Sequence, residues 1–145
     1  MGRPFVKGMI VSGPLGERRE TALLDTGSHV TIIAEHTAKG AGYDCGPDDE
    51  PTSVTVLGRE IPACVRRVRI RIDGSECDTW VNAYVAKDAL PGTYSHILGA
   101  DFAAAAGLRL DMRRNRNLVQ CGLRQPGAPK EQPMTGRPLR YQYRS

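Results

Sequence analysis

The sequence predicts an all-β domain with one or two short helices, formed by residues 5–121. The chain has 16 glycines and 10 prolines among 145 residues, a composition that favours turns and short strands over a helical bundle. Short apolar runs are separated by turn-forming residues, and one segment alternates apolar and polar side chains. With 40% hydrophobic and 25% charged residues, the chain can bury one core without a metal or a disulfide.

The first part of the domain reads as three strands followed by a short helix and a loop. Strands are expected over these ranges: 5–11, 18–24 and 30–33. Ser12-Gly13-Pro14 supplies a turn between the first two strands. A helix is predicted over 34–39, ended by Gly40. Residues 43–53 are acidic and contain proline and glycine, so we expect a loop.

The clearest periodicity lies in residues 65–85. Apolar Val68, Ile70 and Ile72 alternate with Arg67, Arg69 and Arg71, the pattern of a half-buried strand. Asp73-Gly74 predicts a two-residue hairpin turn, and a return strand through Trp80, Asn82 and Tyr84 follows. No aromatic residues interleave with the arginines as they do in proteins that bind single strands of nucleic acid. We therefore expect the arginines to form a solvated outer face.

The last part of the domain combines a short apolar strand, a helix and a hairpin. A loop over 89–94 precedes the apolar run 95–98, which ends at Gly99. Asp101 is expected to cap a helix over 102–106 that Gly107 terminates. A final hairpin is expected from these two ranges: 108–112 and 117–121. Residues 1–4 form an N-terminal segment, and 122–145, with four prolines and few apolar residues, predict a disordered tail.

Charge and cysteine content narrow the possible classes of protein. The net charge of +4 arises wholly from residues 122–145, because acidic and basic groups cancel before them. A nucleic-acid partner is therefore not expected, except through this basic tail. The four cysteines form no C-x-x-C pair, so no zinc site of that kind is predicted. No metal or other cofactor is expected.

A cytoplasmic protein with reduced thiols is the expectation for location. No apolar stretch has the length of a signal peptide or a membrane span. The thiols read as small core hydrophobes, with Cys64 and Cys121 the best candidates for burial. A disulfide framework stays possible by parity, although nothing else in the sequence suggests secretion.

The residues with the clearest chemical meaning are Asp25-Thr26-Gly27-Ser28, which follow the apolar pair Leu23-Leu24. A carboxylate placed after a buried strand, on a turn that uses the freedom of Gly27, is held rigidly. Thr26 and Ser28 offer hydroxyls to the carboxylate or the nearby backbone. Such a site suits the activation of one bound water. The alternative is a plain turn with a capping aspartate.

These residues resemble the retropepsin-like aspartic proteases, whose signature is two apolar residues, D-T/S-G-A/S and a further apolar strand. The second element of that family, an apolar pair and a glycine before a short helix, is matched by Ile97-Leu98-Gly99, with Asp101 following. Between them the family carries a flap hairpin, for which 54–61 stand in the right place, with Val56, Leu57 and Gly58 at its tip. The resemblance implies a closed β-barrel or sandwich.

The resemblance implies an aspartic endopeptidase that works as a homodimer. The chain is too short for two lobes and holds one D-T-G, so the second carboxylate would be Asp25 of a second copy. One Asp25 would act as general base on water, and the protonated one would polarise the scissile carbonyl. Thr26 would bond across the dimer, Ser28 would support the carboxylate, and the flap would close over an extended polypeptide held as an added strand.

Two departures from the retroviral pattern keep a second interpretation open. His29 stands where retroviral members usually carry an acidic residue, and Ala100 where the later motif has arginine, so both halves of that ion pair are missing. The flap tip also has a single glycine, Gly58. A non-catalytic dimeric module with the same fold is the alternative. A third possibility makes the domain a dimerising platform whose basic tail binds nucleic acid.

Other polar residues have simpler interpretations. His29 could touch substrate or be a polar turn residue. His36 and His96 have no acidic or cysteine neighbours at ligand spacing, so surface or capping roles are favoured. The acidic group 48–50 lacks the ligand spacing of a calcium loop and reads as solvated.

Overall fold

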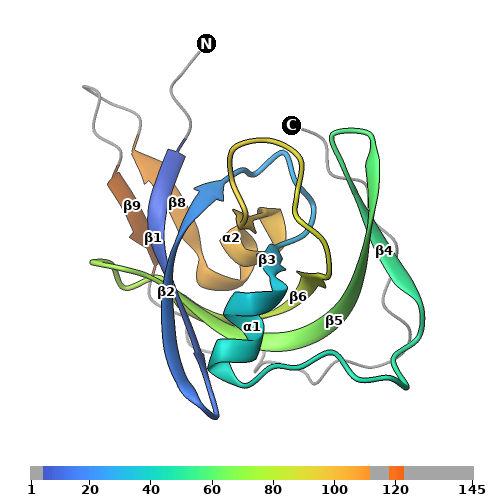
Figure 1. The fold of residues 1–145 in the computed structure, drawn as a ribbon. Coiled ribbons are helices and arrows are strands. Elements are labelled where there is room, and N and C mark those ends of the chain that lie inside the picture. Colours follow the sequence, from blue (N-terminus) through green and yellow to red (C-terminus); the bar gives the residue numbers. More distant parts are fainter. Residues whose placement is uncertain (1–4, 112–117, 123–145) are drawn as a thin grey trace.

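The computed structural model describes residues 5–111 and 118–122, which form nine strands and two short helices (Figure 1). In chain order the elements are β1 (Phe5–Gly13), β2 (Gly16–Leu24), β3 (Ile32–Ala34), α1 (Glu35–Ala41), β4 (Thr52–Val56), β5 (Arg59–Ile72), β6 (Asp78–Ala86), β7 (Ile97–Leu98), α2 (Ala100–Ala106), β8 (Leu108–Asp111) and β9 (Leu118–Cys121). The predicted all-β class with two short helices is confirmed. The expected segment 1–4, the tip of the last hairpin and the expected tail after Gly122 lie outside the described residues.

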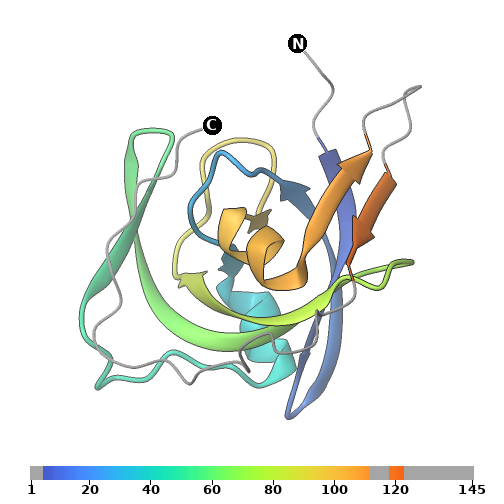
Figure 2. The ribbon, with the colours of Figure 1, turned by 180° about the vertical axis from the view of Figure 1, so that it is seen from behind.

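The main sheet closes into a ring. Its strand order is β1-β2-β7-β3-β6-β5-β4, and β1 also pairs with β5, so six strands form a closed circuit and β4 extends it as a hairpin arm. Figures 1 and 2 show β5 curving along the base of the ring and rising into this arm. β8 and β9 form a separate two-stranded sheet. The expected closed barrel is therefore present.

β5 follows the predicted alternation, but its connection to β6 is longer than expected. Val68, Ile70 and Ile72 are buried. Arg71 pairs in register with Asp78, so residues 73–76 form the turn instead of the predicted Asp73-Gly74 pair alone. Ser75 explains the longer turn, because its amide and hydroxyl both donate to the Ile72 carbonyl and its hydroxyl accepts the Cys77 amide.

The arginines of β5 are largely matched by neighbouring side chains. Arg69 makes two hydrogen bonds to the Asp78 carboxylate, at 3.1 and 2.9 Å, and Arg71 lies 3.0 Å from Glu17. The Arg67 guanidinium lies 6.0 Å from the centre of the Trp80 ring. Arg69 and Arg71 are therefore paired with acidic side chains, and Arg67 lies near an aromatic ring.

The first helix, α1, ends later than predicted. Gly42, not Gly40, is its C-cap, with a φ of 103° and an amide that donates to the carbonyls of Ala38 and Lys39. A Cβ on Gly40 would lie 2.3 Å from Nε of Arg18. Arg18 is exposed and its side chain can move aside, so this approach does not require glycine at position 40, and the left-handed stop falls at Gly42.

The expectation of reduced thiols is wrong, because the four cysteines form two disulfides, Cys45–Cys64 and Cys77–Cys121. Cys64 and Cys77 are buried, while Cys121 is half-buried, so the burial expected for Cys121 is only partial. Cysteine pairing depends on distances in the fold, and sequence spacing gave no signal of them.

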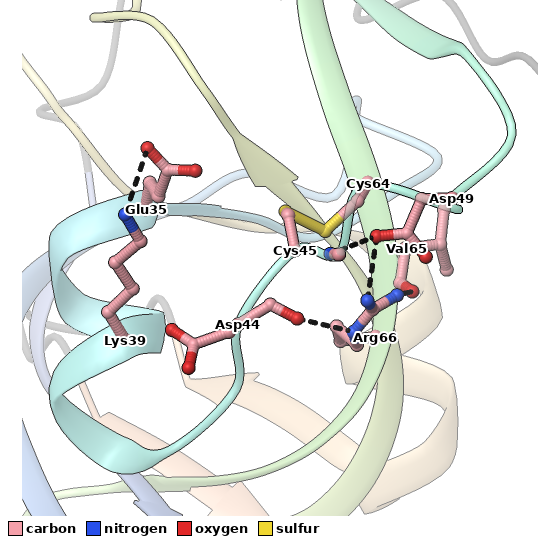
Figure 3. The surroundings of a disulfide bond; sticks show 9 residues. Glu35, Lys39, Asp44, Cys45, Asp49, Cys64, Val65 and Arg66 are labelled. Atoms are coloured by element: carbon pink, nitrogen blue, oxygen red, sulfur yellow. Dashed lines mark hydrogen bonds and ion pairs between the residues drawn. A yellow bond between two sulfur atoms is a disulfide. The ribbon is translucent and has the colours of Figure 1, made fainter.

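The first disulfide ties the loop before β4 to β5 (Figure 3). Arg66 reinforces this tie, since its side chain donates to the Asp44 carbonyl and to the Asp49 carboxylate at 2.7 Å. The hydrogen bond from Arg66 holds the pKa of Asp49 below its usual value. Asp49 is therefore engaged with Arg66, unlike the solvated acidic loop predicted for 48–50.

Two clusters of apolar side chains fill the interior. The larger one lies between the ring and the helices and includes Met9, Val68 and Phe102. The smaller one lies under the β4–β5 hairpin and joins its side chains to those of Val30 and Ile97. Among the residues that the structure describes, neither helix has the length and apolar character needed to cross a bilayer.

Candidate active site

Asp25 is held by the pairing of β2 with β7. The two strands run parallel, with Leu23 opposite Ile97 and Leu24 opposite Leu98. The Leu23 amide donates to the His96 carbonyl at 3.0 Å, and the Asp25 amide donates to the Leu98 carbonyl at 2.9 Å. Leu24 and Leu98 are buried. The backbone of Asp25 is therefore fixed at the point where β2 leaves the core.

The residues after β2 form a short loop that is held by hydrogen bonds within it. We call residues 25–31 the floor loop. One carboxylate oxygen of Asp25 accepts the Gly27 amide at 2.8 Å, while the Ser28 amide donates to the Asp25 carbonyl. Asp25 is half-buried and Thr26 is exposed. The Ser28 hydroxyl is buried and donates to the Val30 carbonyl at 2.7 Å, so it supports the loop backbone. The carboxylate is thus oriented yet accessible.

Gly99 packs backbone to backbone against the floor loop. A Cβ at this position would lie 2.3 Å from the Val30 carbonyl oxygen and 2.8 Å from that of Ser28. The next amide, of Ala100, donates to the Ser28 carbonyl at 2.7 Å. Any larger residue would separate these segments, which gives a physical reason for glycine after Ile97-Leu98.

Asp101 does not cap its helix as predicted. The N-cap of α2 is Gly99, and the Asp101 carboxylate reaches across to Thr31, accepting its hydroxyl at 2.7 Å and its amide at 3.1 Å. The Thr31 hydroxyl in turn accepts the Gly99 amide. Burial raises the pKa of Asp101, while the hydrogen bonds from Thr31 oppose the rise. Asp101 therefore joins α2 to the end of the floor loop.

Thr31 is a functional residue that the sequence reasoning missed. It is completely buried and lies inside the β-branched run 30–33. A hydroxyl in such a run needs a hydrogen-bond partner when it is buried, and this was the available signal. Ala100 and His29 stand where retroviral members have the two halves of an ion pair. Here the hydrogen bonds between Thr31 and Asp101 connect the two segments that contain these positions. His29 itself is exposed.

The predicted flap is the β4–β5 hairpin. Val56 pairs with Arg59, and the two residues between them, Leu57 and Gly58, both have positive φ, 48° and 78°, as a type I′ turn requires. Val56 is buried in the smaller cluster, whereas Leu57 is 53% exposed. The hairpin tip, the floor loop and the connection between β6 and β7 lie at the same end of the ring (Figures 1 and 2).

Leu57 lies near the connection between β6 and β7, since a Cβ added to Gly92 would lie 3.4 Å from Leu57 Cδ1. A pocket of about 310 Å³ lies elsewhere, beside α1, and Asp25 is not among its lining residues.

The chain was compared with models of known protein families and with curated proteins. A family model described as aspartyl protease matches residues 11–102, a span that includes the floor loop, the hairpin and Ile97-Leu98-Gly99. No curated protein shows significant similarity to the chain.

Proposed function

Because the chain belongs to an aspartyl protease family of the pepsin-like clan, we propose that it is an aspartic endopeptidase with Asp25 as its catalytic residue. The observation that carries the proposal is the position of Asp25. Its backbone is fixed by Leu98, one carboxylate oxygen is oriented by Gly27, and the side chain stays accessible. This is the pre-organisation that a general base for water requires.

The proposed enzyme is a homodimer that pairs two copies of Asp25. Aspartic proteases use two carboxylates that share one proton, because like charges a few ångströms apart do not both ionise. The other acidic side chain bonded to the floor loop, Asp101, is engaged by Thr31 and by the Phe102 amide. A second copy is therefore the natural source of the second carboxylate. The exposed Thr26 is proposed to contact its counterpart across the dimer.

In the proposed mechanism the ionised Asp25 removes a proton from the water that attacks the scissile carbonyl carbon. The protonated Asp25 of the second copy donates a hydrogen bond to the carbonyl oxygen and stabilises the tetrahedral intermediate. The protonated Asp25 of the second copy then donates its proton to the amine as the C–N bond breaks, and the pair keeps the one proton taken from water.

The proposed substrate is an extended polypeptide bound between the floor loop and the flap. The hairpin tip offers backbone groups for pairing with an added strand, and the exposed Leu57 offers an apolar contact for a substrate side chain. The expectation of a cytoplasmic location came from the lack of an apolar stretch of signal-peptide length and was combined with reduced thiols. The two disulfides instead support the proposal of an oxidising compartment.

The test is cleavage of an unfolded protein by Asp25→Asn, assayed at pH values from about 3 to 8, which bracket carboxylate titration. We expect kcat/KM to fall at least about a thousandfold, since the variant loses the group that activates water. Asp48→Asn is the matched control, because it removes an exposed carboxylate from a distant loop. Undiminished cleavage by Asp25→Asn refutes the proposal. A folded, dimeric wild type without cleavage at any pH would support the non-catalytic module.

A further inference from the structure

Three potential metal ligands from separate elements meet although they are far apart in sequence. Glu20 lies on β2, His36 on α1, and His96 immediately before β7. Each offers a ligand atom, and these atoms all lie within 4.8 Å of one another. Nε2 of His36 lies 3.7 Å from a Glu20 carboxylate oxygen, and the two imidazole rings are 6.0 Å apart at an angle of 67°.

Two imidazoles and one carboxylate are a donor set typical of Zn²⁺ sites that keep a fourth position for water. Bonds of about 2.0–2.2 Å to zinc require ligand atoms roughly 3.3–3.5 Å apart, so the three groups need to close by about 1 Å. His36 and Glu20 can move, since their side chains are 71% and 36% exposed. His96 is 2% exposed and provides a fixed point. We propose that Glu20, His36 and His96 bind one Zn²⁺ ion.

The surroundings of His96 are compatible with this role. Burial lowers the pKa of His96, which keeps the ring in the neutral form that ligates a metal. Its Nε2 lies 2.9 Å from the Thr37 hydroxyl, and the ring also hydrogen-bonds the Thr21 backbone. A backbone contact such as the one to Thr21 orients metal-binding histidines, whereas the Thr37 hydroxyl competes with a metal for Nε2. Metal binding through Nε2 would displace the Thr37 hydroxyl from the ring.

The position of the cluster gives the ion a structural role. The His96 carbonyl accepts the Leu23 amide, so a metal there would clamp α1 to the junction of the two strands that position Asp25. His36 also lines the 310 Å³ pocket beside α1, together with Ser95. The other cluster of ligand types, Cys45, Asp49 and Cys64, is no candidate because its two sulfur atoms are joined.

The test is titration of the untagged, chelator-treated full chain with ZnSO₄ by calorimetry, with Co²⁺ absorption as a second readout. We expect one ion per chain, a thermal unfolding midpoint that rises by several degrees at saturating zinc, and visible bands from Co²⁺ in a low-coordinate site. His36→Ala and Glu20→Gln change side chains with exposed surface, so both should fold. Each should weaken zinc binding by more than about tenfold.

His29→Ala is the matched control, because it removes an exposed histidine away from the cluster and should leave zinc affinity unchanged. Absence of binding to wild type would overturn the proposal. Binding that survives in both His36→Ala and Glu20→Gln would overturn it equally. These measurements do not depend on cleavage, so they stand or fall separately from the proposed protease activity.

Discussion

The floor loop and the hairpin tip face the same end of the ring, but they are held in different ways. The floor loop is bonded to β7 and α2 through Asp25, Ser28 and Thr31. The hairpin tip has a two-residue turn, an exposed Leu57, and open space around Gly58. A fixed carboxylate and a less constrained cover are the two properties that a water-activating site over a polymeric substrate needs.

The two regions also use glycine for different physical reasons. Gly99 is needed because backbone atoms of the floor loop occupy the space of a Cβ. Gly58 is needed because its φ is 78°, while nothing lies within 4 Å of a Cβ there. The same substitution at both positions therefore separates the cost of a steric clash from the cost of a left-handed backbone.

The largest loss of stability is expected for Gly99→Ala. A methyl group 2.3 Å from the Val30 carbonyl oxygen must push the floor loop away from α2, which should lower the free energy of unfolding by about 3 kcal/mol. Urea unfolding at fixed protein concentration measures this loss. A variant as stable as wild type would show that the floor loop is not packed tightly on Gly99.

Thr31→Val should come next, with a loss of about 2 kcal/mol. The change removes the hydroxyl that bonds Asp101 and the Gly99 amide and leaves these groups short of partners. Thr55→Val, on the hairpin, is the matched control and should change stability by less than about 0.5 kcal/mol. If Thr31→Val and Thr55→Val lowered stability equally, the floor loop would not be held more firmly than the hairpin.

Gly58→Ala should cost only about 1 kcal/mol, the penalty of a left-handed conformation for a residue with a Cβ. Its larger effect should fall on cleavage, through a raised KM, because the tip is proposed to contact substrate. Urea unfolding and steady-state kinetics on the same preparation separate the effect on stability from the effect on KM. A loss of stability as large as that of Gly99→Ala would contradict the comparison.

The smallest expected effect is a pH dependence of stability that arises from Asp101, which is bonded to the floor loop. Burial raises the pKa of Asp101 above its ordinary value, so the folded state binds this proton more tightly than the unfolded state. Asp101 therefore favours folding less as pH rises from about 3.8 through its folded pKa. The stability of wild type relative to Asp101→Asn should decline over that window. A rise over the same window would mean that the Thr31 hydrogen bonds outweigh burial.

Much of the fold and the centre of the site could be predicted because their signals are local. Alternation in β5, the apolar pair before Asp25 and the run Ile97-Leu98-Gly99 are patterns of neighbouring residues. The helix ending was wrong because Gly40 and Gly42 are both acceptable stops, and the left-handed conformation falls at Gly42. Local patterns place elements more surely than their ends.

Features that depend on long-range distances could not be predicted. The bond between Thr31 and Asp101, the two disulfides, and the meeting of Glu20 with two histidines all join segments that only the folded ring brings together. Asp101 illustrates the difficulty. The sequence correctly places Asp101 at the start of a helix. Its carboxylate, however, accepts the buried hydroxyl of Thr31, which lies far away in the sequence.

The central claim, that two chains each contribute one Asp25, is tested most directly by mixing subunits. Wild type and Asp25→Asn are combined in varying ratio at constant total concentration, allowed to exchange, and assayed for cleavage. If both carboxylates are required, activity follows the square of the wild-type fraction, so an equal mixture retains about one quarter of the wild-type rate. Activity that falls linearly, to about one half in the equal mixture, would mean that each chain works alone and would contradict the account.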